Sequence, residues 1–412
     1  MVDDGSGDVE GEGRSAVVPS EIEAISEHVE AGMPDLLSEL EALVSIDCGT
    51  HTKDGVDAVG RRVAWILTGA GGSITTHPGG ALGDSIVATF PGDPAMPRLL
   101  LLAHMDTVFD PGTAAARPFR IADGLATGPG VADMKAGLLV GIHAVAAARA
   151  VAGGALGTIV FLANADEEIG SPSSVGLIRD AASRADAVLV LECARASGAI
   201  VSSRKGAADV RLRIAGRAAH AGVEPEKGRS AILEAAHLTV ALHALPARYR
   251  TVTCNVGVLK GGTRPNVVAA NAILDVDIRA ATAAELDAAL AAVQALAAAP
   301  TVPDVTVTVE KVSGWPPMEK SRAAARLAGH ARAIAATLGF DLEDVITGGA
   351  SDGNTTSGMG IPTLDGLGPI GGLDHSPSEY VEVASIAPRT TLLAALMLAI
   401  ARDPAFVAAP RS

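Results

Sequence analysis

The chain has 412 residues, of which 48% are hydrophobic and only 2% aromatic, so two or three domains with an aliphatic core are expected. Its formal net charge is -15, from 47 acidic and 32 basic side chains, and no segment gathers Lys and Arg into a cluster. This charge pattern argues against a nucleic-acid partner, because phosphate backbones are bound by clustered basic side chains.

The N-terminal segment and the cysteines favour a cytoplasmic protein. Residues 1–20 are acidic and rich in Gly and Ser, unlike the basic and apolar regions of an export signal, and we predict a disordered tail. Three widely spaced cysteines, an odd number, favour reduced thiols over a disulfide framework. Apolar runs such as residues 136–150 are shorter than the roughly 20 residues of a membrane-spanning helix, so no membrane contact is expected.

The first half of the chain alternates short apolar runs with Ala-rich helical segments. Residues 98–103, 158–163 and 187–191 are typical of buried strands, and residues 136–150 are typical of a helix. This alternation predicts an α/β catalytic domain with a mostly parallel or mixed sheet that is flanked by helices.

Beyond residue 207 the predicted strands and helices follow one another in the order β-α-β-β-α-β. They are residues 208–214, 230–245, 251–258, 269–279, 283–299 and 305–312. This is the order of a ferredoxin-like α+β unit, so we predict an inserted domain at residues 208–315. The chain then returns to the first domain, which comprises residues 21–207 and 316–412.

A side chain of a type that commonly binds metal ions follows each predicted strand of the first domain. His104 comes directly after the first strand, and Glu192 comes directly after the third. The adjacent carboxylates Glu167 and Glu168 come shortly after the second. Because sites in open α/β sheets form at the carboxyl edge of the strands, these groups are expected to meet in one crevice.

Two further candidates lie in Gly-rich loops, Asp133 before a predicted helix and His375 near the end of the chain. Taken singly, each candidate is more often an ordinary surface carboxylate or a hydrogen-bonded histidine, so only the set indicates a site. Two imidazoles with three carboxylates suit zinc or another first-row divalent ion, with cobalt and manganese as alternatives, and are too rich in nitrogen for calcium.

Five ligands can make two three-ligand sites only if one carboxylate bridges two ions, which then lie roughly 3.5–4 Å apart as in hydrolytic two-metal sites. Asp133 is the candidate bridge. Asp106, two residues after His104, can accept a hydrogen bond from the imidazole and fix its tautomer. In the Glu167-Glu168 pair, one carboxylate can bind metal while the other takes a proton from the attacking water.

Six segments together resemble one known family. They are, in chain order, LLLLAHMDTV, ATGPGVADMKAG, FLANADEEIGS, LVLECA, RAAHAGVEPEKG and GLDHSPSEY, and the resemblance covers nearly the whole chain from about residue 35. The family is that of the dinuclear zinc metallopeptidases, which includes glutamate carboxypeptidase, acetylornithine deacetylase, succinyl-diaminopimelate desuccinylase, aminoacylase and peptidase T. The segments TKDGVDAVGR, FRIADGLATGPGVADMKAG and ITGGASDGN are most similar to the folate-cleaving glutamate carboxypeptidase branch.

The resemblance implies two zinc sites that share one carboxylate. One ion would be held by His104, Asp133 and Glu192. The other would be held by Asp133, Glu168 and His375.

The resemblance also assigns roles around these ligands. Glu167 would be the general base, and Asp106 would orient His104. The peptide bond after the bridging residue, here Asp133-Met134, is often cis in such enzymes.

In this family the inserted domain is a lid that also forms a homodimer. His220 is similar to the histidine that reaches the active site from the partner subunit and stabilises the oxyanion. Asn266 and Arg279 resemble substrate-binding residues, and Arg279 suits a bidentate grip on a free carboxylate. The backbone around Gly349 would bind the same carboxylate.

The expected reaction is hydrolysis of an amide bond next to a free carboxylate, in a small peptide or an N-acyl amino acid, by a metal-bridging hydroxide that Glu167 activates. Two alternatives stay open: a deacylase of N-acyl amino acids or a dipeptidase of the same family, and, more remotely, a non-catalytic binding protein. Ile346 stands where the glutamate-cleaving branch carries a basic residue, which puts glutamate specificity in question. Met134 stands where that branch has an acid, which does not affect the metals.

Overall fold

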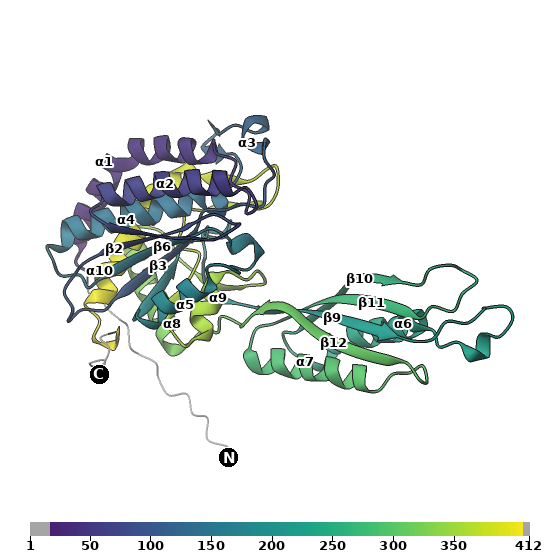
Figure 1. Cartoon of the computed structure of the whole chain (residues 1–412). Helices are drawn as coiled ribbons and strands as arrows, with labels where there is room; N and C mark the ends of the chain where they lie inside the picture. Colours follow the sequence, from purple (N-terminus) through teal and green to yellow (C-terminus); the bar gives the residue numbers. More distant parts are fainter. Residues whose placement is uncertain (1–16, 407–412) are drawn as a thin grey trace, which may run out of the picture.

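The computed structural model describes residues 17–406, so the predicted tail lies almost entirely outside the described residues. The last two residues of the predicted tail, residues 19 and 20, are helical, because helix α1 (Pro19–Val44) begins with a proline in its first turn. Figure 1 shows an α/β body from which a second, elongated unit extends.

A six-stranded mixed sheet forms the centre of the α/β body. Its strands lie in the order β1 (Ser73–His77), β2 (Ser85–Phe90), β6 (Ile159–Asn164), β3 (Leu99–His104), β7 (Ala187–Val190) and β14 (Thr363–Leu364). β6, β3, β7 and β14 are parallel, whereas at one edge β2 pairs antiparallel with β6 and β1 pairs antiparallel with β2. β3 and β6 are buried along their whole length, as expected for a sheet covered on both faces. The predicted mixed sheet is confirmed.

Helices cover both faces of this sheet. One hydrophobic cluster joins alternate strand residues such as Leu101 and Phe161 to the larger group of helices. These helices are α1, α2 (Lys53–Gly69), α4 (Ala136–Ala152), α8 (Arg322–Thr337) and α10 (Val383–Ala401). A smaller cluster joins Leu100 and Leu162 to α5 (Val175–Ser183) on the other face, next to the short helix α9 (Asp352–Gly358).

The two most apolar helical segments, Val131–Ala152 and Val383–Ala401, are long enough to cross a membrane, but 83% of the most apolar stretch of each is buried inside the protein. They pack as core helices. Gly137 lets α4 approach very closely, since a Cβ atom there would lie 1.9 Å from the carbonyl oxygen of Leu191. This contact holds the start of α4 against the end of β7, where two predicted ligands lie.

Small sheets complete the body. One contains β15 (Gly371–Gly372), β16 (Tyr380–Glu382), β5 (Leu125–Thr127) and β4 (Arg120–Ala122) in that order. Because β5 precedes the loop of Asp133, and β15 and β16 flank the loop of His375, this sheet brings the two loops together. A second pair joins β8 (Ile200–Arg204) and β13 (Asp344–Thr347) in parallel.

Residues 206–315, which we call the inserted unit, form an antiparallel sheet covered on one face by two helices (Figure 1). Its elements are β9 (Gly206–Ala215), α6 (Ala231–Ala244), β10 (Thr253–Gly261), β11 (Asn271–Ala280), α7 (Ala283–Ala298) and β12 (Thr306–Trp315). The order β10-β11-β9-β12 is that of a ferredoxin-like sheet, as predicted. The unit has its own hydrophobic cluster, and its predicted limits, residues 208–315, stay a prediction.

The chain enters and leaves the inserted unit through two adjacent backbone segments. Arg204 and Met318 form an antiparallel bridge, in which each N–H donates to the other residue's carbonyl oxygen at 3.0 Å. The two chain segments that join the inserted unit to the α/β body therefore run side by side.

The end of α10 is fixed to α8 by a buried carboxylate, Asp403. Arg326 donates Nη2–H to Oδ1 of Asp403 at 2.8 Å, and Nε2 of His330 lies 2.7 Å from Oδ2. Burial raises the pKa of Asp403, but the hydrogen bonds from Arg326 and His330 lower it more, to about 2. The folded pKa lies below that of the unfolded chain, so the carboxylate stabilises the fold above about pH 4, and this stabilisation is lost as the pH falls toward 2.

We therefore expect Asp403→Asn to lower the thermal unfolding temperature at pH 7, by the equivalent of about 1–3 kcal/mol. The difference between variant and wild type should shrink as the pH falls toward 2, and Asp341→Asn, an exposed residue, serves as the control. Equal unfolding temperatures of Asp403→Asn and wild type at pH 7 would contradict this assignment.

Candidate metal centre

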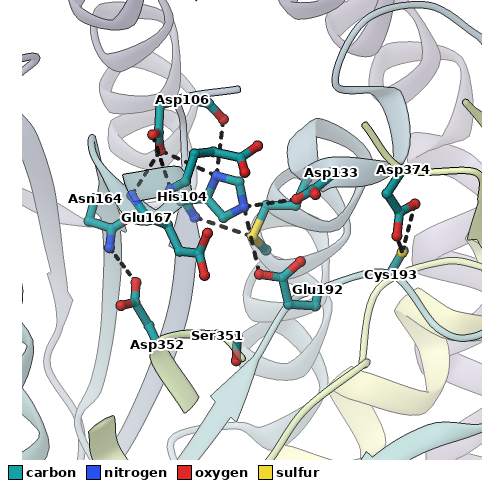
Figure 2. A network of polar contacts seen from close by, with 12 residues as sticks. His104, Asp106, Asp133, Asn164, Glu167, Glu192, Cys193, Ser351, Asp352 and Asp374 are labelled. Carbon is teal, nitrogen blue, oxygen red and sulfur yellow. Dashed lines mark hydrogen bonds and ion pairs between the residues drawn. The ribbon is translucent and has the colours of Figure 1, made fainter. Parts of the chain in front are cut away.

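The five predicted ligands gather around the carboxylate of Asp133. Nε2 of His104 lies 3.0 Å from Oδ1 of Asp133 and 3.6 Å from Oε1 of Glu192. Nε2 of His375 lies 3.1 Å from Oδ2 of Asp133 and 3.2 Å from Oε2 of Glu168. The two oxygens of Asp133 thus face two different histidines, and each histidine lies beside a second carboxylate. Figure 2 shows the set that contains His104 and Glu192.

The fold explains why residues far apart in sequence meet here. His104 ends β3, and Glu192 lies two residues beyond β7, its parallel neighbour. Glu168 lies in a 3-10 turn, Glu167–Ile169, shortly after β6. Asp133 and His375 come from the two loops that the small sheet joins. The Asp133-Met134 peptide bond is cis, as the family resemblance implied.

The donor set fits a divalent cation. One ligand atom each from His104, Asp133 and Glu168 lie within 4.8 Å of one another. Oε1 of Glu168 is buried and has no hydrogen-bonding partner among residues 17–406, although buried polar atoms are nearly always paired. Imidazole nitrogens together with carboxylate oxygens are the ligands of zinc and similar ions. The residues present therefore fit a divalent cation at this centre.

The electrostatics of the cluster point the same way. Burial, together with the negative charge of Asp133, raises the pKa of Glu192 to about 8. Burial also raises the pKa of Asp133, but hydrogen bonds from His104 and His375 lower it more, to well below its usual value. The pKa of His375 is raised to about 11 by its contacts with Asp133 and Glu168. Carboxylates gathered at this density repel one another, and divalent cations relieve such repulsion.

Asp106 is fully buried behind this cluster and holds the turn that carries the paired glutamates. Its carboxylate accepts hydrogen bonds from the backbone N–H groups of Glu167 at 3.1 Å and Glu168 at 3.3 Å, and from the hydroxyl of Thr50 at 2.6 Å. Its contact with the imidazole of His104 is made mainly by the backbone: Nδ1 lies 3.0 Å from the carbonyl oxygen and 3.4 Å from the carboxylate. Asp106 thus positions two segments of the centre.

The carboxylate of Glu167 makes no polar contact within the described residues, whereas Oε2 of Glu168 contacts His375. Among residues 17–406 the Glu167 carboxylate has no hydrogen-bonding partner, and Figure 2 shows it between His104 and Asp352. Its pKa is raised well above the usual value, mainly by burial. The nearby imidazole of His104 opposes this shift, and the negative charges of Glu192, Asp352 and Glu168 contribute to it. A carboxylate of this kind is suited to accept a proton.

His220 and Asn266 lie together but away from the metal centre. The N–H of Ala221 donates to the carbonyl oxygen of Asn266 at 3.0 Å, and His220 is exposed. Strand β9 begins at the junction with the α/β body and runs to the remote end of the inserted unit (Figure 1). His220 follows this remote end of β9, so both residues lie far from the α/β body. Within one chain, the structure does not bring them to the five ligands.

Arg279 and Gly349, in contrast, lie at the junction of the two parts. Arg279 donates Nη1–H to the carbonyl oxygen of Gly348 at 2.9 Å, and its Nε lies 3.1 Å from both carboxylate oxygens of Asp277. The carbonyl oxygen of Gly349 accepts a hydrogen bond from Nη1 of Arg204 at 3.2 Å. The predicted substrate-binding loop is thus held by two arginines.

Three buried polar residues of the centre were not predicted. Nε–H of Arg204 donates to Oδ2 of Asp365 at 2.6 Å. Burial lowers the pKa of Arg204, but the charge of Asp365 raises it above the usual value, with weaker contributions from Glu192 and Glu167. Asp352 accepts a hydrogen bond from Ser171 at 2.5 Å, and burial raises its pKa to about 6. Burial raises the pKa of Glu379 to about 7, against backbone hydrogen bonds that lower it. The sequence gives little signal for Arg204, because only Ile200 and Val201 of the strand that it ends are apolar.

Comparison with known proteins gives consistent matches. Residues 100–399 match the family described as Peptidase family M20/M25/M40. Carboxypeptidase G2 of Pseudomonas sp. (strain RS-16) is 33% identical over 373 residues, which cover 89% of each chain. N-acetyl-L-citrulline deacetylase of Xanthomonas campestris pv. campestris is 30% identical over 205 residues, 47% of this chain and 54% of that protein.

Solved structures share the fold. The aminopeptidase PepT of Bacillus cereus ATCC 10987 superposes with a TM-score of 0.73 and 25% identity, covering 90% of this chain and 99% of that one. Human carnosine dipeptidase 1 has a TM-score of 0.67 at 15% identity, over 92% of this chain and 99% of that one, which shows a common fold alone.

Proposed function

The chain belongs to peptidase family M20/M25/M40, a family of metal-dependent hydrolases, and from this premise we propose that it is a carboxypeptidase for small peptides or N-acyl amino acids. It would cleave an amide bond next to a free carboxylate. The observation that carries the proposal is the pair of three-residue sets that share Asp133. The match to hydrolases leaves no support for the remote alternative of a non-catalytic binding protein.

In this proposal one ion binds His104, Asp133 and Glu192, and the other binds Asp133, Glu168 and His375. Zinc fits the donor set, with cobalt and manganese as alternatives. When bound, the two ions polarise the amide carbonyl and lower the pKa of the attacking water.

Glu167 takes the proton from the attacking water and returns it to the departing amine nitrogen. The support for this role is its free carboxylate beside His104 and a pKa that burial raises. Asp106 keeps Glu167 in place through the backbone hydrogen bond at 3.1 Å.

The proposed active unit is a homodimer, in which His220 and Asn266 of one chain complete the site of the other. This fits their position at the remote end of the inserted unit. Strand β10 is an outer strand of its sheet, and this strand and α6 expose apolar side chains that a partner would cover. These side chains are Ile232, Leu233, Val240 and Leu259.

Arg279 and the backbone N–H groups near Gly349 are proposed to bind the substrate carboxylate, since both lie at the junction next to Arg204. A cavity of about 390 Å³ beside Glu168, lined in part by Val108, Phe109 and Ile169, offers room for the acyl side of a small substrate. The cytoplasmic localisation stays a prediction.

Metal content and substrate preference test the proposal together. The purified protein should bind two divalent ions per chain, and it should hydrolyse acyl-glutamates, N-acetyl amino acids or dipeptides when these are assayed side by side. Amidation of the substrate carboxylate should lower kcat/KM by roughly 100-fold or more, because the buried polar groups of the site would lose their partner. A protein without zinc, cobalt or manganese, or one that cleaves amidated substrates equally well, would contradict the proposal.

The same set of substrates distinguishes the proposed carboxypeptidase from a second candidate, a deacylase of N-acyl amino acids. One observation favours it: Ile346 in β13 is exposed, at 54%, where the glutamate-cleaving branch has a basic residue. Preference for N-acetyl amino acids over acyl-glutamates would select it.

A further inference from the structure

The carboxylate of Glu379 binds the backbone of the loop that carries Asp133. Its Oε1 accepts hydrogen bonds from the N–H groups of Ala132 at 2.8 Å and of Asp133 itself at 3.0 Å. Its Oε2 accepts one from the N–H of Gly130 at 2.9 Å. Three donors from four consecutive residues therefore converge on one side chain, which is only 1% exposed.

Within the part of the chain that the structure describes, no cation pairs with this buried carboxylate. Among residues 17–406, Glu379 has no ion pair, although Lys135 is buried close by in the same loop. The ammonium group of Lys135 instead donates to the carbonyl oxygens of Ile46 and Pro129, at 3.2 Å and 3.1 Å. A carboxylate buried without a cation is costly, and here it also lies near the negative charge of Asp133, which opposes its ionisation. Hydrophobic packing alone would not favour a glutamate at this position.

The position of Glu379 along the chain links two of the candidate ligands. It lies four residues after His375, immediately before β16 (Tyr380–Glu382). His375 contacts Oδ2 of the Asp133 side chain, while Glu379 accepts a hydrogen bond from the backbone N–H of the same residue. One short segment therefore sets both the orientation of the Asp133 backbone and the place of its histidine neighbour.

We propose that Glu379 is a positioning residue that fixes Asp133 relative to His375 and so maintains the geometry in which one carboxylate serves two ions. This inference rests on the proposed function of the metal centre. Glu379 itself touches neither ion nor substrate; it acts through three peptide N–H groups. Residues of this kind, bound to the ligands rather than to the metal, commonly change metal affinity by about 10- to 100-fold.

Glu379→Gln is the test variant, because it keeps the size of the side chain but places an amide N–H₂ opposite at least one backbone donor. We expect the variant to bind zinc about 10- to 100-fold more weakly, measured by competition with a chelator on the full-length protein. We further expect kcat to fall while KM changes little. The matched control is Glu382→Gln, three residues further along the same segment, whose half-buried carboxylate makes no hydrogen bond within the described residues.

Hydrogen exchange on the metal-free proteins supplies a readout independent of activity. The peptide that spans residues 128–135 should exchange at least about 10-fold faster in Glu379→Gln than in the wild type, because its protected amides lose their acceptor. The metal-free wild type should show protection of this peptide in any case, so the proposal remains testable if the variant does not fold. An unprotected peptide in the wild type would overturn it.

The outcomes separate this proposal from the proposed function. Wild-type protein that fails to bind two divalent ions would refute the metal centre itself. Wild-type protein that binds two ions, together with a Glu379→Gln variant that binds them as tightly and exchanges as slowly, would refute only the role of Glu379. A variant that is less stable but keeps wild-type metal affinity would show an ordinary structural residue and would also overturn the proposal.

Discussion

Glu167→Gln should retain both metal ions and lose most of its turnover. The amide has the size of the carboxylate but cannot accept a proton, so we expect kcat to fall roughly 100- to 10,000-fold, the usual contribution of a general base. The ions should remain, because the side chain of Glu167 makes no contact with the five ligands that the structure records as a hydrogen bond or ion pair, whereas Glu168 lies 3.2 Å from His375. The measurement is kcat at saturating zinc, together with the metal content of the same sample.

The neighbouring substitution Glu168→Gln is the control for this experiment. It changes the same chemical group one residue away, and its expected effect is loss of one ion, since the second three-residue set would lose a carboxylate. If Glu167→Gln turns over at the wild-type rate, or loses metal to the same extent as Glu168→Gln, the division of roles within the pair is wrong.

His220→Ala should lower kcat by roughly 100- to 1,000-fold, as expected for loss of a group that stabilises an oxyanion. Because His220 lies at the remote end of the inserted unit, we expect it to serve the partner's site rather than its own. Dimers that combine one Glu167→Gln chain with one His220→Ala chain should then regain activity, although each variant alone is nearly inactive.

The expected size of this recovery follows from the symmetry of a two-fold dimer. In a mixed dimer, the chain with His220→Ala retains Glu167 and receives His220 from its partner, so one site of two is complete. Mixed dimers isolated by two different affinity tags should therefore have about half the activity of wild-type dimers. If His220 acted within its own chain, no mixed dimer would have a complete site, and activity would stay at the level of the single variants.

The strand-end ligands could be predicted because two simple constraints act together. Uninterrupted apolar runs must be buried on both faces of a sheet, and parallel strands end at a common edge. The structure pairs Leu101 with both Phe161 and Leu189, and this register places the ends of β3, β6 and β7 side by side. His104 and Glu192 therefore lie where the sequence pattern predicts them.

Other features depend on contacts that leave little trace in a sequence. Glu379 and Asp106 act through backbone N–H groups of distant loops, and every residue type except proline can supply such a donor. The sheet that joins the loops of Asp133 and His375 has strands of only two or three residues, too short for a periodic pattern. Helix α2, in contrast, could have been predicted from its buried Val56, Val59, Val63 and Leu67, which recur at helical spacing.

The bridge between Arg204 and Met318 has a consequence for how such a protein can evolve. Since the chain leaves and re-enters the α/β body at neighbouring points, the inserted unit takes the place of a hairpin loop in the topology. Loops of this kind tolerate insertion and replacement without a change in strand order. Mutation can therefore reshape the surface of the inserted unit, while β3, β6 and β7 continue to bring the same side chains to the same edge.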